Sequence, residues 1–251
     1  MSAKDDLYRL IQSMSKSEKR YFKLDTKKSG DQTNYLRLFD AINDMDEYDE
    51  EKLKKKFKGQ KFIKHLSQEK KYLYEAILRS MRNYNSDKSS VAQIKECLLD
   101  ARYLYDRGLY DQSGKVLKKA RKIAYLFEDH MAILEIVREE QRLVADSKRK
   151  TIEEDIEVLI KEKDATLKLI EEEFSYQDIY YRLFNKVVHK FELKDESSHK
   201  ELEAIAPFED LAKQTLPQSK IAQHRLYQSL ANYYQLIGQY EKSHEYHYKV
   251  V

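Results

Sequence analysis

Few residues of this sequence have types and spacings that could support catalysis. The single cysteine, Cys97, could act as a nucleophile, but Ile94 and Leu98 lie beside it on a periodic apolar face. No histidine is near it in the sequence, and a free cysteine in such a setting is usually buried as a small apolar side chain. We therefore expect Cys97 to be structural.

Two of the seven histidines, His244 and His247, are three residues apart, with Glu241 and Glu245 beside them. This spacing is compatible with metal ligands, but two surface or interface imidazoles explain it more simply. The sequence lacks the glycine-rich phosphate-binding motifs, the Gly-x-Ser-x-Gly of hydrolases and the His-Glu-x-x-His of zinc proteases. We predict no catalytic residue, no metal ligand and no cofactor, and thus a protein that is not an enzyme.

A basic stretch is a stronger candidate for binding. Between residues 52 and 64 the chain has seven lysines and no acidic residue. They are Lys52, Lys54, Lys55, Lys56, Lys58, Lys61 and Lys64. A basic field attracts nucleic-acid phosphates through counterion release, but six acidic residues between positions 44 and 51 can neutralise much of it, and base readout favours arginine. A solvated surface, a nucleic-acid interface and a site for an acidic protein all remain open.

Composition narrows the class of protein further. The 251 residues include only 5 Gly and 2 Pro, which excludes collagen-like chains, and 20 Tyr and 9 Phe, which argue against disorder. One cysteine cannot form an internal disulfide. The N-terminal residues have no apolar core of the kind a signal peptide needs, and no run approaches the roughly 18 apolar residues of a membrane span. We expect a soluble, cytoplasmic protein that does not enter a membrane.

The elements that must position these residues are helices. Apolar residues recur at spacings of three and four along nearly the whole chain, while strict alternation is never sustained, so the sequence predicts an all-α fold. Ser15 and Glu18 have the spacing of a capping box and predict a helix start; Ser175 and Asp178 predict a break near residue 175. A polar segment at 83–90 separates a basic N-terminal helical subdomain, 1–88, from a second region, 89–251.

The second region contains an internal similarity. Ala231, Tyr234, Gly238, Tyr240 and Ser243 correspond in offset to Ala101, Leu104, Gly108, Tyr110 and Ser113. The small residue lets paired helices approach, and the glycine takes the turn conformation that other residues avoid. This pattern resembles the tetratricopeptide repeat (TPR) family, whose units are helix–turn–helix pairs. Asp100 departs from the family's usual leucine, and the two glycines are 130 residues apart, so the intervening units must be irregular in length.

The resemblance implies an N-terminal helical subdomain followed by a TPR-like α-α superhelical (solenoid) array, whose groove binds another protein or a peptide. The inner-helix positions of the two matched units then give the candidate groove residues Arg102, Tyr105, Gln228, Asn232 and Gln235. We accordingly expect a non-enzymatic protein–protein interaction scaffold or adaptor. The alternative is a nucleic-acid-binding regulator that uses the basic N-terminal helices, with the repeats as a sensor or dimerisation module.

The last helix of the sequence has no polar closing face. Tyr246, Tyr248 and Val250 run to the terminus, whereas solenoids need a capping repeat for solubility. We therefore expect the array to continue beyond Val251, or this helix to pack against another subunit. The oligomeric state does not follow from the sequence.

Overall fold

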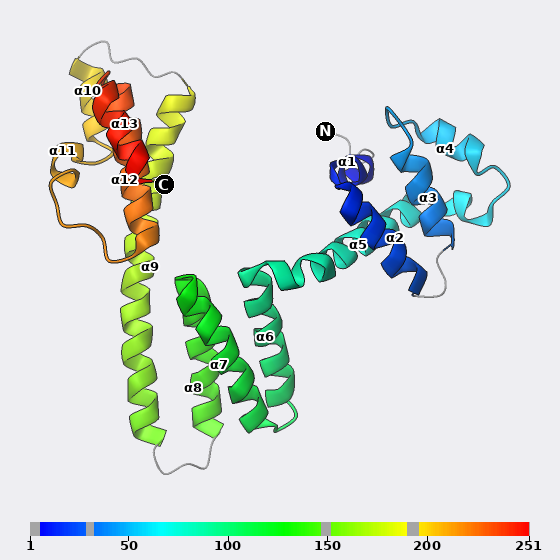
Figure 1. Cartoon of the computed structure of the whole chain (residues 1–251), viewed down its shortest axis with the longest axis horizontal. Coiled ribbons are helices and arrows are strands. Elements are labelled where there is room, and N and C mark those ends of the chain that lie inside the picture. The colour runs from blue at the N-terminus through cyan, green and yellow to red at the C-terminus, as the bar shows by residue number, and fades with distance from the viewer. Residues whose placement is uncertain (1–5, 29–32, 147–151, 190–195, 251) are drawn as a thin grey trace. The chain divides into compact units, whose positions relative to one another are not determined.

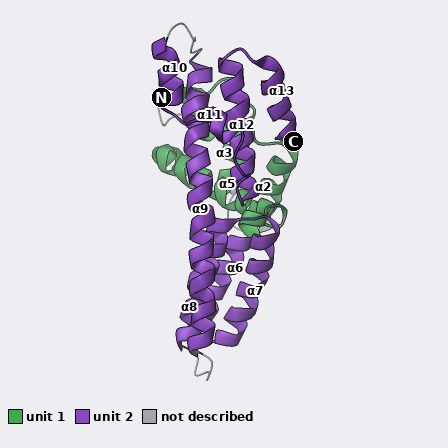
Figure 2. Ribbon diagram, turned by 90° about the vertical axis from the view of Figure 1, so that its left-hand side faces the viewer, with its two compact units in different colours: residues 1–93 green, residues 94–251 purple. Residues whose placement is uncertain are grey.

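The computed structural model describes residues 6–28, 33–146, 152–189 and 196–250, and all regular structure in these ranges is helical. They contain thirteen α-helices, two short 3-10 helices and no strand, so the predicted all-α class is confirmed. The chain divides into two compact units, residues 1–93 and 94–251 (Figure 1, Figure 2). This division lies five residues after the predicted boundary at residue 88. In the part of the chain that the structure describes, no helix is long and apolar enough to cross a membrane.

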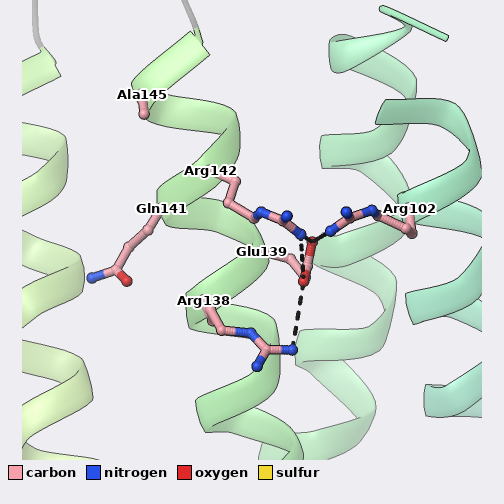
Figure 3. Close-up of a pocket in the computed structure, with 6 residues that line it drawn as sticks. All are labelled: Arg102, Arg138, Glu139, Gln141, Arg142 and Ala145. Atoms are coloured by element: carbon pink, nitrogen blue, oxygen red, sulfur yellow. Dashed lines mark hydrogen bonds and ion pairs between the residues drawn. The ribbon is translucent and has the colours of Figure 1, made fainter. Parts of the chain in front are cut away.

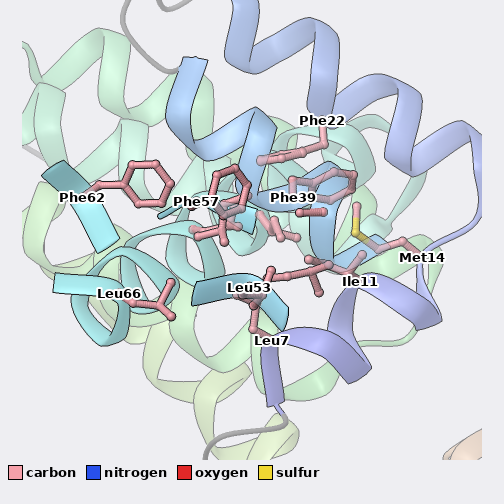
Figure 4. Close-up of a cluster of buried hydrophobic side chains, with 14 residues drawn as sticks. Leu7, Ile11, Met14, Phe22, Phe39, Leu53, Phe57, Phe62 and Leu66 are labelled. Atoms are coloured by element: carbon pink, nitrogen blue, oxygen red, sulfur yellow. The ribbon is translucent and has the colours of Figure 1, made fainter. Parts of the chain in front are cut away.

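Unit 1 is built from short helices around one apolar core. They are α1 (Asp6–Ser13), α2 (Lys16–Lys28), α3 (Thr33–Asn43), α4 (Glu50–Lys56), η1 (Lys61–His65), α5 (Leu66–Asn85) and η2 (Ser86–Lys88). Ile11, Phe22, Phe39, Leu53 and Leu73, one from each α-helix, are at most 1 % exposed and belong to the same cluster (Figure 4). Burial of these side chains drives the packing of the unit, in which α1 to α4, with 7 to 13 residues each, are too short to be stable alone.

The predicted start of α2 is confirmed in atomic detail. The backbone N–H of Ser15 donates to the Glu18 carboxylate at 2.7 Å, and the backbone N–H of Glu18 donates to the Ser15 hydroxyl at 3.3 Å. These two reciprocal bonds form the capping box that the sequence predicts, and they satisfy N–H groups that a helix start leaves unpaired.

Unit 2 is built around α9 (Ile152–Val188), which has 37 residues. The helices of this unit are α6 (Ser90–Tyr105), which begins just before the division, α7 (Tyr110–Leu126), α8 (His130–Asp146), α9, α10 (Glu196–Glu203), α11 (Phe208–Leu211), α12 (Lys220–Leu236) and α13 (Tyr240–Lys249). Figure 1 and Figure 2 show α8 beside the N-terminal half of α9, and α12 beside its C-terminal half. Leu159 and Leu183 of α9 belong to two separate apolar cores. At 1.5 Å per residue, α9 thus joins cores about 36 Å apart.

The predicted break near residue 175 is wrong, because α9 continues through it for 37 residues without interruption. The hydroxyl of Ser175 donates to the carbonyl of Glu171, one turn earlier, at 2.8 Å instead of capping a new helix. A serine inside a helix commonly makes this backward bond. Spacing alone does not separate the two uses of the side chain.

The two helix pairs that carry the repeat pattern, α6–α7 and α12–α13, have the same turn geometry. Gly108 and Gly238 have φ of +73° and +75°. The residue after each glycine donates its N–H to the carbonyl five residues earlier, at 3.0 Å in the first pair and 2.8 Å in the second. Within each pair, Ser113 and Ser243 donate their buried hydroxyls to the carbonyls of Ala101 and Ala231, at 2.8 and 2.9 Å. The sequence similarity thus corresponds to identical local bonding.

Candidate functional site

Two of the five predicted groove residues, Arg102 and Tyr105, lie near the end of α6 and contact α8. The Arg102 Nη1 atom is 3.5 Å from the Glu139 carboxylate, and its Nε atom is 3.3 Å from the carboxylate of Asp106, the first residue after α6. The Tyr105 hydroxyl donates to the carboxylate of Asp146. Both predicted residues therefore contribute to one surface between two helices.

Helix α8 adds two more arginines to this surface, as Figure 3 shows. The Arg138 Nη2 atom is 3.7 Å from the Glu139 carboxylate, and the Arg142 Nη1 atom is 3.1 Å from it. We call this surface the arginine hollow: an open depression of about 630 Å³ lined by Arg102, Arg138, Glu139, Gln141, Arg142 and Ala145. The guanidinium carbons of Arg102 and Arg142 also lie 5.9 and 5.8 Å from the centre of the Tyr105 ring.

The hydrogen-bonding balance of the arginine hollow favours anions. Each guanidinium carries five N–H donors, and three guanidiniums here share the single carboxylate of Glu139. Arg138 is the farthest of the three from Glu139, at 3.7 Å, and its side chain is 69 % exposed to solvent. Arginine binds carboxylates and phosphates with paired hydrogen bonds, so the hollow can accept the acidic side chains of a partner.

Arg138 and Arg142 were not among the predicted groove residues. Their spacing of four residues places them on one face of α8, and this is visible in the sequence. What the sequence does not give is the register of α8 against α6, which brings both arginines to Arg102. The repeat pattern had no match within α8, and so offered no position to transfer.

The remaining predicted groove residues lie on one face of α12. Gln228 accepts a hydrogen bond from Arg225 at 2.7 Å, and Gln235 is exposed. Asn232 is only 9 % exposed, which differs from the open position expected of a groove contact. The structure does not place these residues in the arginine hollow, whose lining comes from α6 and α8.

The predicted basic patch is exposed around a buried apolar stripe. Leu53, Phe57 and Phe62 point into the core of unit 1 (Figure 4), while all seven lysines lie outside it. Lys54 pairs with Glu50 and Glu51 at 3.3 and 2.9 Å. The side chains of the other six lysines have no partner among the described residues.

Asp49 and Glu50, two of the six acidic residues before the patch, have partners other than the lysine side chains of the patch. The carboxylate of Asp49 caps α4 by accepting from the Lys52 N–H at 3.0 Å. Glu50 accepts from Lys70 of α5 at 2.6 Å. Direct ion pairs between these carboxylates and the patch are therefore formed at Lys54 only, among the described residues.

Of the residues considered for catalysis or metal binding, Cys97 is buried, and His244 and His247 are exposed. Cys97 is 5 % exposed in the core shared by α6, α7 and α8, and burial raises the pKa of its thiol, which disfavours the reactive thiolate. His244 packs edge-on against the ring of Tyr248, with centroids 4.6 Å apart. Across the described ranges, no group of three or more His, Cys, Asp or Glu residues is arranged to hold a metal ion.

Comparisons with known proteins do not assign the chain to a family. No protein-family model, curated protein or solved structure matches it significantly. Its function is therefore inferred from the chemistry of the surfaces described above.

Proposed function

We propose that the chain is a non-enzymatic scaffold or adaptor that binds an acidic segment of another protein on TPR-like helix pairs. The observation that carries this proposal is the arginine hollow, in which Arg102, Arg138 and Arg142 surround the Glu139 carboxylate. The ring of Tyr105 lies beside Arg102 and Arg142. Guanidinium groups in excess of their internal acceptors are suited to bind carboxylates that a partner supplies.

The repeated turn geometry supports the TPR-like part of the proposal. Gly108 and Gly238 adopt the same left-handed conformation, and the serine five residues after each makes the same bond to the preceding helix. Stacked pairs of this kind expose the first helix of each pair for binding, and α6, which carries Arg102, is the first helix of its pair.

The test is a selection of random peptides on the immobilised full chain, followed by affinity measurements. Peptides enriched by the selection are expected to contain Asp or Glu. Their binding, measured by fluorescence anisotropy, should weaken by at least about tenfold in Arg138→Ala/Arg142→Ala, as for loss of paired arginine contacts. Lys118→Ala/Lys122→Ala is the matched control, because it removes two exposed cations at the same spacing from α7. Selected peptides without acidic residues, or equal losses in both variants, would contradict the proposal.

A second candidate function, nucleic-acid binding through unit 1, is favoured by the six exposed lysines that have no partner among the described residues. Its test is the binding of a labelled single-stranded DNA or RNA oligomer to the full chain between about 50 and 200 mM salt. Affinity should fall steeply with salt, and Lys55→Ala/Lys58→Ala/Lys61→Ala should reduce both the affinity and the salt slope. No binding at low salt would leave these lysines as solvated surface.

A further inference from the structure

A second hollow lies where two distant segments of unit 2 meet. The turn between α7 and α8 forms one wall, and the first turns of α12 form the other. The hollow has a volume of about 430 Å³ and is lined by Leu126, Phe127, Glu128, Lys220, Ile221, His224 and Arg225. We call it the apolar hollow, because Leu126, Phe127 and Ile221 are 77, 57 and 40 % exposed. Large apolar side chains gathered at a surface and bordered by polar ones mark interaction sites.

Glu128 connects the two walls, and its backbone has an unfavourable conformation. Its φ is +51°, the only positive φ of a non-glycine residue among the described residues. The turn has the same bonding as the two glycine turns, since the Asp129 N–H donates to the carbonyl of Ala124 at 2.9 Å. Where those turns have Gly108 and Gly238, this one has a residue whose Cβ disfavours the left-handed region.

The side chain of Glu128 makes contacts that glycine cannot make. One carboxylate oxygen accepts from the backbone N–H of Lys220 at 3.3 Å, and the other lies 3.0 Å from the Lys220 Nζ atom. A non-glycine residue in this region is a reason to look for a function. Here it ties the turn to the start of α12, 92 residues later in the chain.

Two carboxylates of α9 fix the second wall. Glu172 accepts from the backbone N–H groups of Gln218 and Ser219 at 3.0 and 3.2 Å. Glu173 accepts from the hydroxyl of Ser219, the N-cap of α12, and lies 2.6 Å from the Nδ1 atom of His130 at the start of α8. The apolar hollow is therefore preformed, which lowers the entropic cost of binding.

The lining of the apolar hollow has a net positive charge. Lys220 and Arg225 carry positive charge at its edge, and Glu128 is the only acidic residue in its lining. Because Glu128 is already bound to Lys220, Arg225 is left as the less neutralised group; it donates to neutral Gln228 and lies 4.9 Å from the Tyr180 ring centre. A partner complementary to this surface has a large apolar side chain next to carboxylates.

We propose that the apolar hollow is a docking site for a short acidic segment of a partner protein, which inserts a large apolar side chain between Leu126, Phe127 and Ile221. Carboxylates beside that side chain bind Arg225 and the ammonium of Lys220. The site goes beyond the arginine hollow, with which it shares no lining residue. Variants can therefore test either hollow without altering the other.

The experiment measures binding of a fluorescein-labelled peptide, Ser-Glu-Glu-Leu-Phe-Glu-Glu-Ser, to the full chain by fluorescence anisotropy. Leu126→Ala/Phe127→Ala removes the apolar side chains that contact the peptide's Leu and Phe, and should weaken binding at least about tenfold. Both side chains are exposed, so we expect the variant to fold. The matched control, Leu99→Ala/Tyr103→Ala, removes a leucine and an aromatic residue that are 72 and 59 % exposed on α6, and should leave binding unchanged. Because the peptide is acidic, it can also bind at the arginine hollow, so both variants are also made in the Arg138→Ala/Arg142→Ala chain. In that chain Leu126→Ala/Phe127→Ala should still weaken binding at least about tenfold, and Leu99→Ala/Tyr103→Ala should not.

Two altered peptides test the chemistry of the occupant. In the Arg138→Ala/Arg142→Ala chain, where the arginine hollow does not contribute, replacing Leu and Phe of the peptide by Ser should abolish saturable binding, and so should replacing every Glu by Lys. The proposal is overturned if either altered peptide binds like the parent, if the control variant loses as much affinity as Leu126→Ala/Phe127→Ala, or if the parent peptide shows no saturable binding up to about 1 mM. It is also overturned if sedimentation shows a dimer that only Leu126→Ala/Phe127→Ala converts to a monomer, because the occupant is then a second copy of the chain.

Discussion

The backbone N–H of Lys220 donates to the carboxylate of Glu128, and Glu128 reaches it from a left-handed conformation with φ of +51°. The bond joins the turn after α7 to the first turn of α12. A glycine adopts this conformation at lower energy, and Gly108 and Gly238 occupy the same position in the related turns. The side chain of Glu128 therefore compensates for strain that its own Cβ creates.

Replacing Glu128 by Ala or by Gly separates the strain from the bond. Glu128→Ala keeps the strain and loses the bond, so it should lower the free energy of unfolding by about 1 kcal/mol. Glu128→Gly loses the bond but removes the strain, and should recover about 0.5–1 kcal/mol relative to Ala. Urea unfolding followed by circular dichroism checks both values. Equal stabilities of the two variants would show that φ at residue 128 is not strained.

Gly108→Ala tests the same conformation without any side-chain bond. An added Cβ would meet no atom within 4 Å, so the expected loss of about 1 kcal/mol comes from φ alone. Gly114→Ala is the matched control: Gly114 lies inside α7, and its added Cβ would be 3.7 Å from Leu143, an ordinary contact. Because alanine favours helix, this variant should gain about 0.5–1 kcal/mol. Thermal unfolding should thus shift in opposite directions for the two Gly→Ala changes.

Local features of the fold could be predicted because they depend on residues close in sequence. The Ser15–Glu18 capping box and the Gly108 and Gly238 turns involve bonds across three to five residues. The continuity of α9 at Ser175 was not predictable in this way, since the same side chain can cap a new helix or bond backward within an existing one. There, tertiary packing of α9 against α8 and α12 decides the outcome.

The two proposed binding surfaces depend on contacts between distant residues, and only part of their lining could be predicted. Arg102 and Tyr105 follow from the repeat pattern, but Arg138 and Arg142 join them only through the register of α8 against α6. The apolar hollow could not be predicted from the sequence, because Phe127 and Ile221 are 94 residues apart. Each is an apolar residue near the end of a helix, and such residues are common. Asn232 was expected to be exposed to solvent but is only 9 % exposed. Its position in the helix gives the face on which it lies, but does not give how closely neighbouring side chains cover that face.

Arg121 of α7 should be a major contributor to the stability of unit 2. It bonds to Glu140 of α8 and lies 2.5 Å from Glu162 of α9, while Tyr125 also donates to Glu162. Arg121→Ala would leave two partly buried carboxylates without their shared cation, so we expect a loss of about 2 kcal/mol in the free energy of unfolding. Arg121→Ala/Glu140→Gln/Glu162→Gln should recover part of this loss. A loss below about 0.5 kcal/mol for Arg121→Ala would instead class the cluster with ordinary surface ion pairs.

Glu50 should make the stability of unit 1 depend on pH. The hydrogen bond from Lys70, at 2.6 Å, is the main cause that lowers the pKa of Glu50 from 4.5 to about 2, and Tyr48 donates to the same oxygen at 3.1 Å. A carboxyl group whose pKa is lower in the folded state stabilises the fold above its unfolded pKa, and this contribution is lost as the pH falls toward the folded pKa. The contribution of Glu50 is therefore complete near pH 7 and declines between about pH 5 and pH 2.

Glu50→Gln measures this contribution directly. At pH 7 the free energy of unfolding of the variant should be about 1 kcal/mol lower than that of the unaltered chain. This value is smaller than the full pKa shift would give, because the Glu50 side chain is 29 % exposed and solvent screens its charge. Near pH 2 Glu50 is protonated in the unfolded chain and about half protonated in the folded chain, so most of the difference in the free energy of unfolding between the two chains should disappear. Glu51→Gln is the matched control: Glu51 pairs with Lys54 at 2.9 Å but is 71 % exposed, and its replacement should cost less than about 0.5 kcal/mol at either pH. A difference between Glu50→Gln and the unaltered chain that persisted in full at pH 2 would show that Glu50 acts through its shape and hydrogen bonds, and not through its charge.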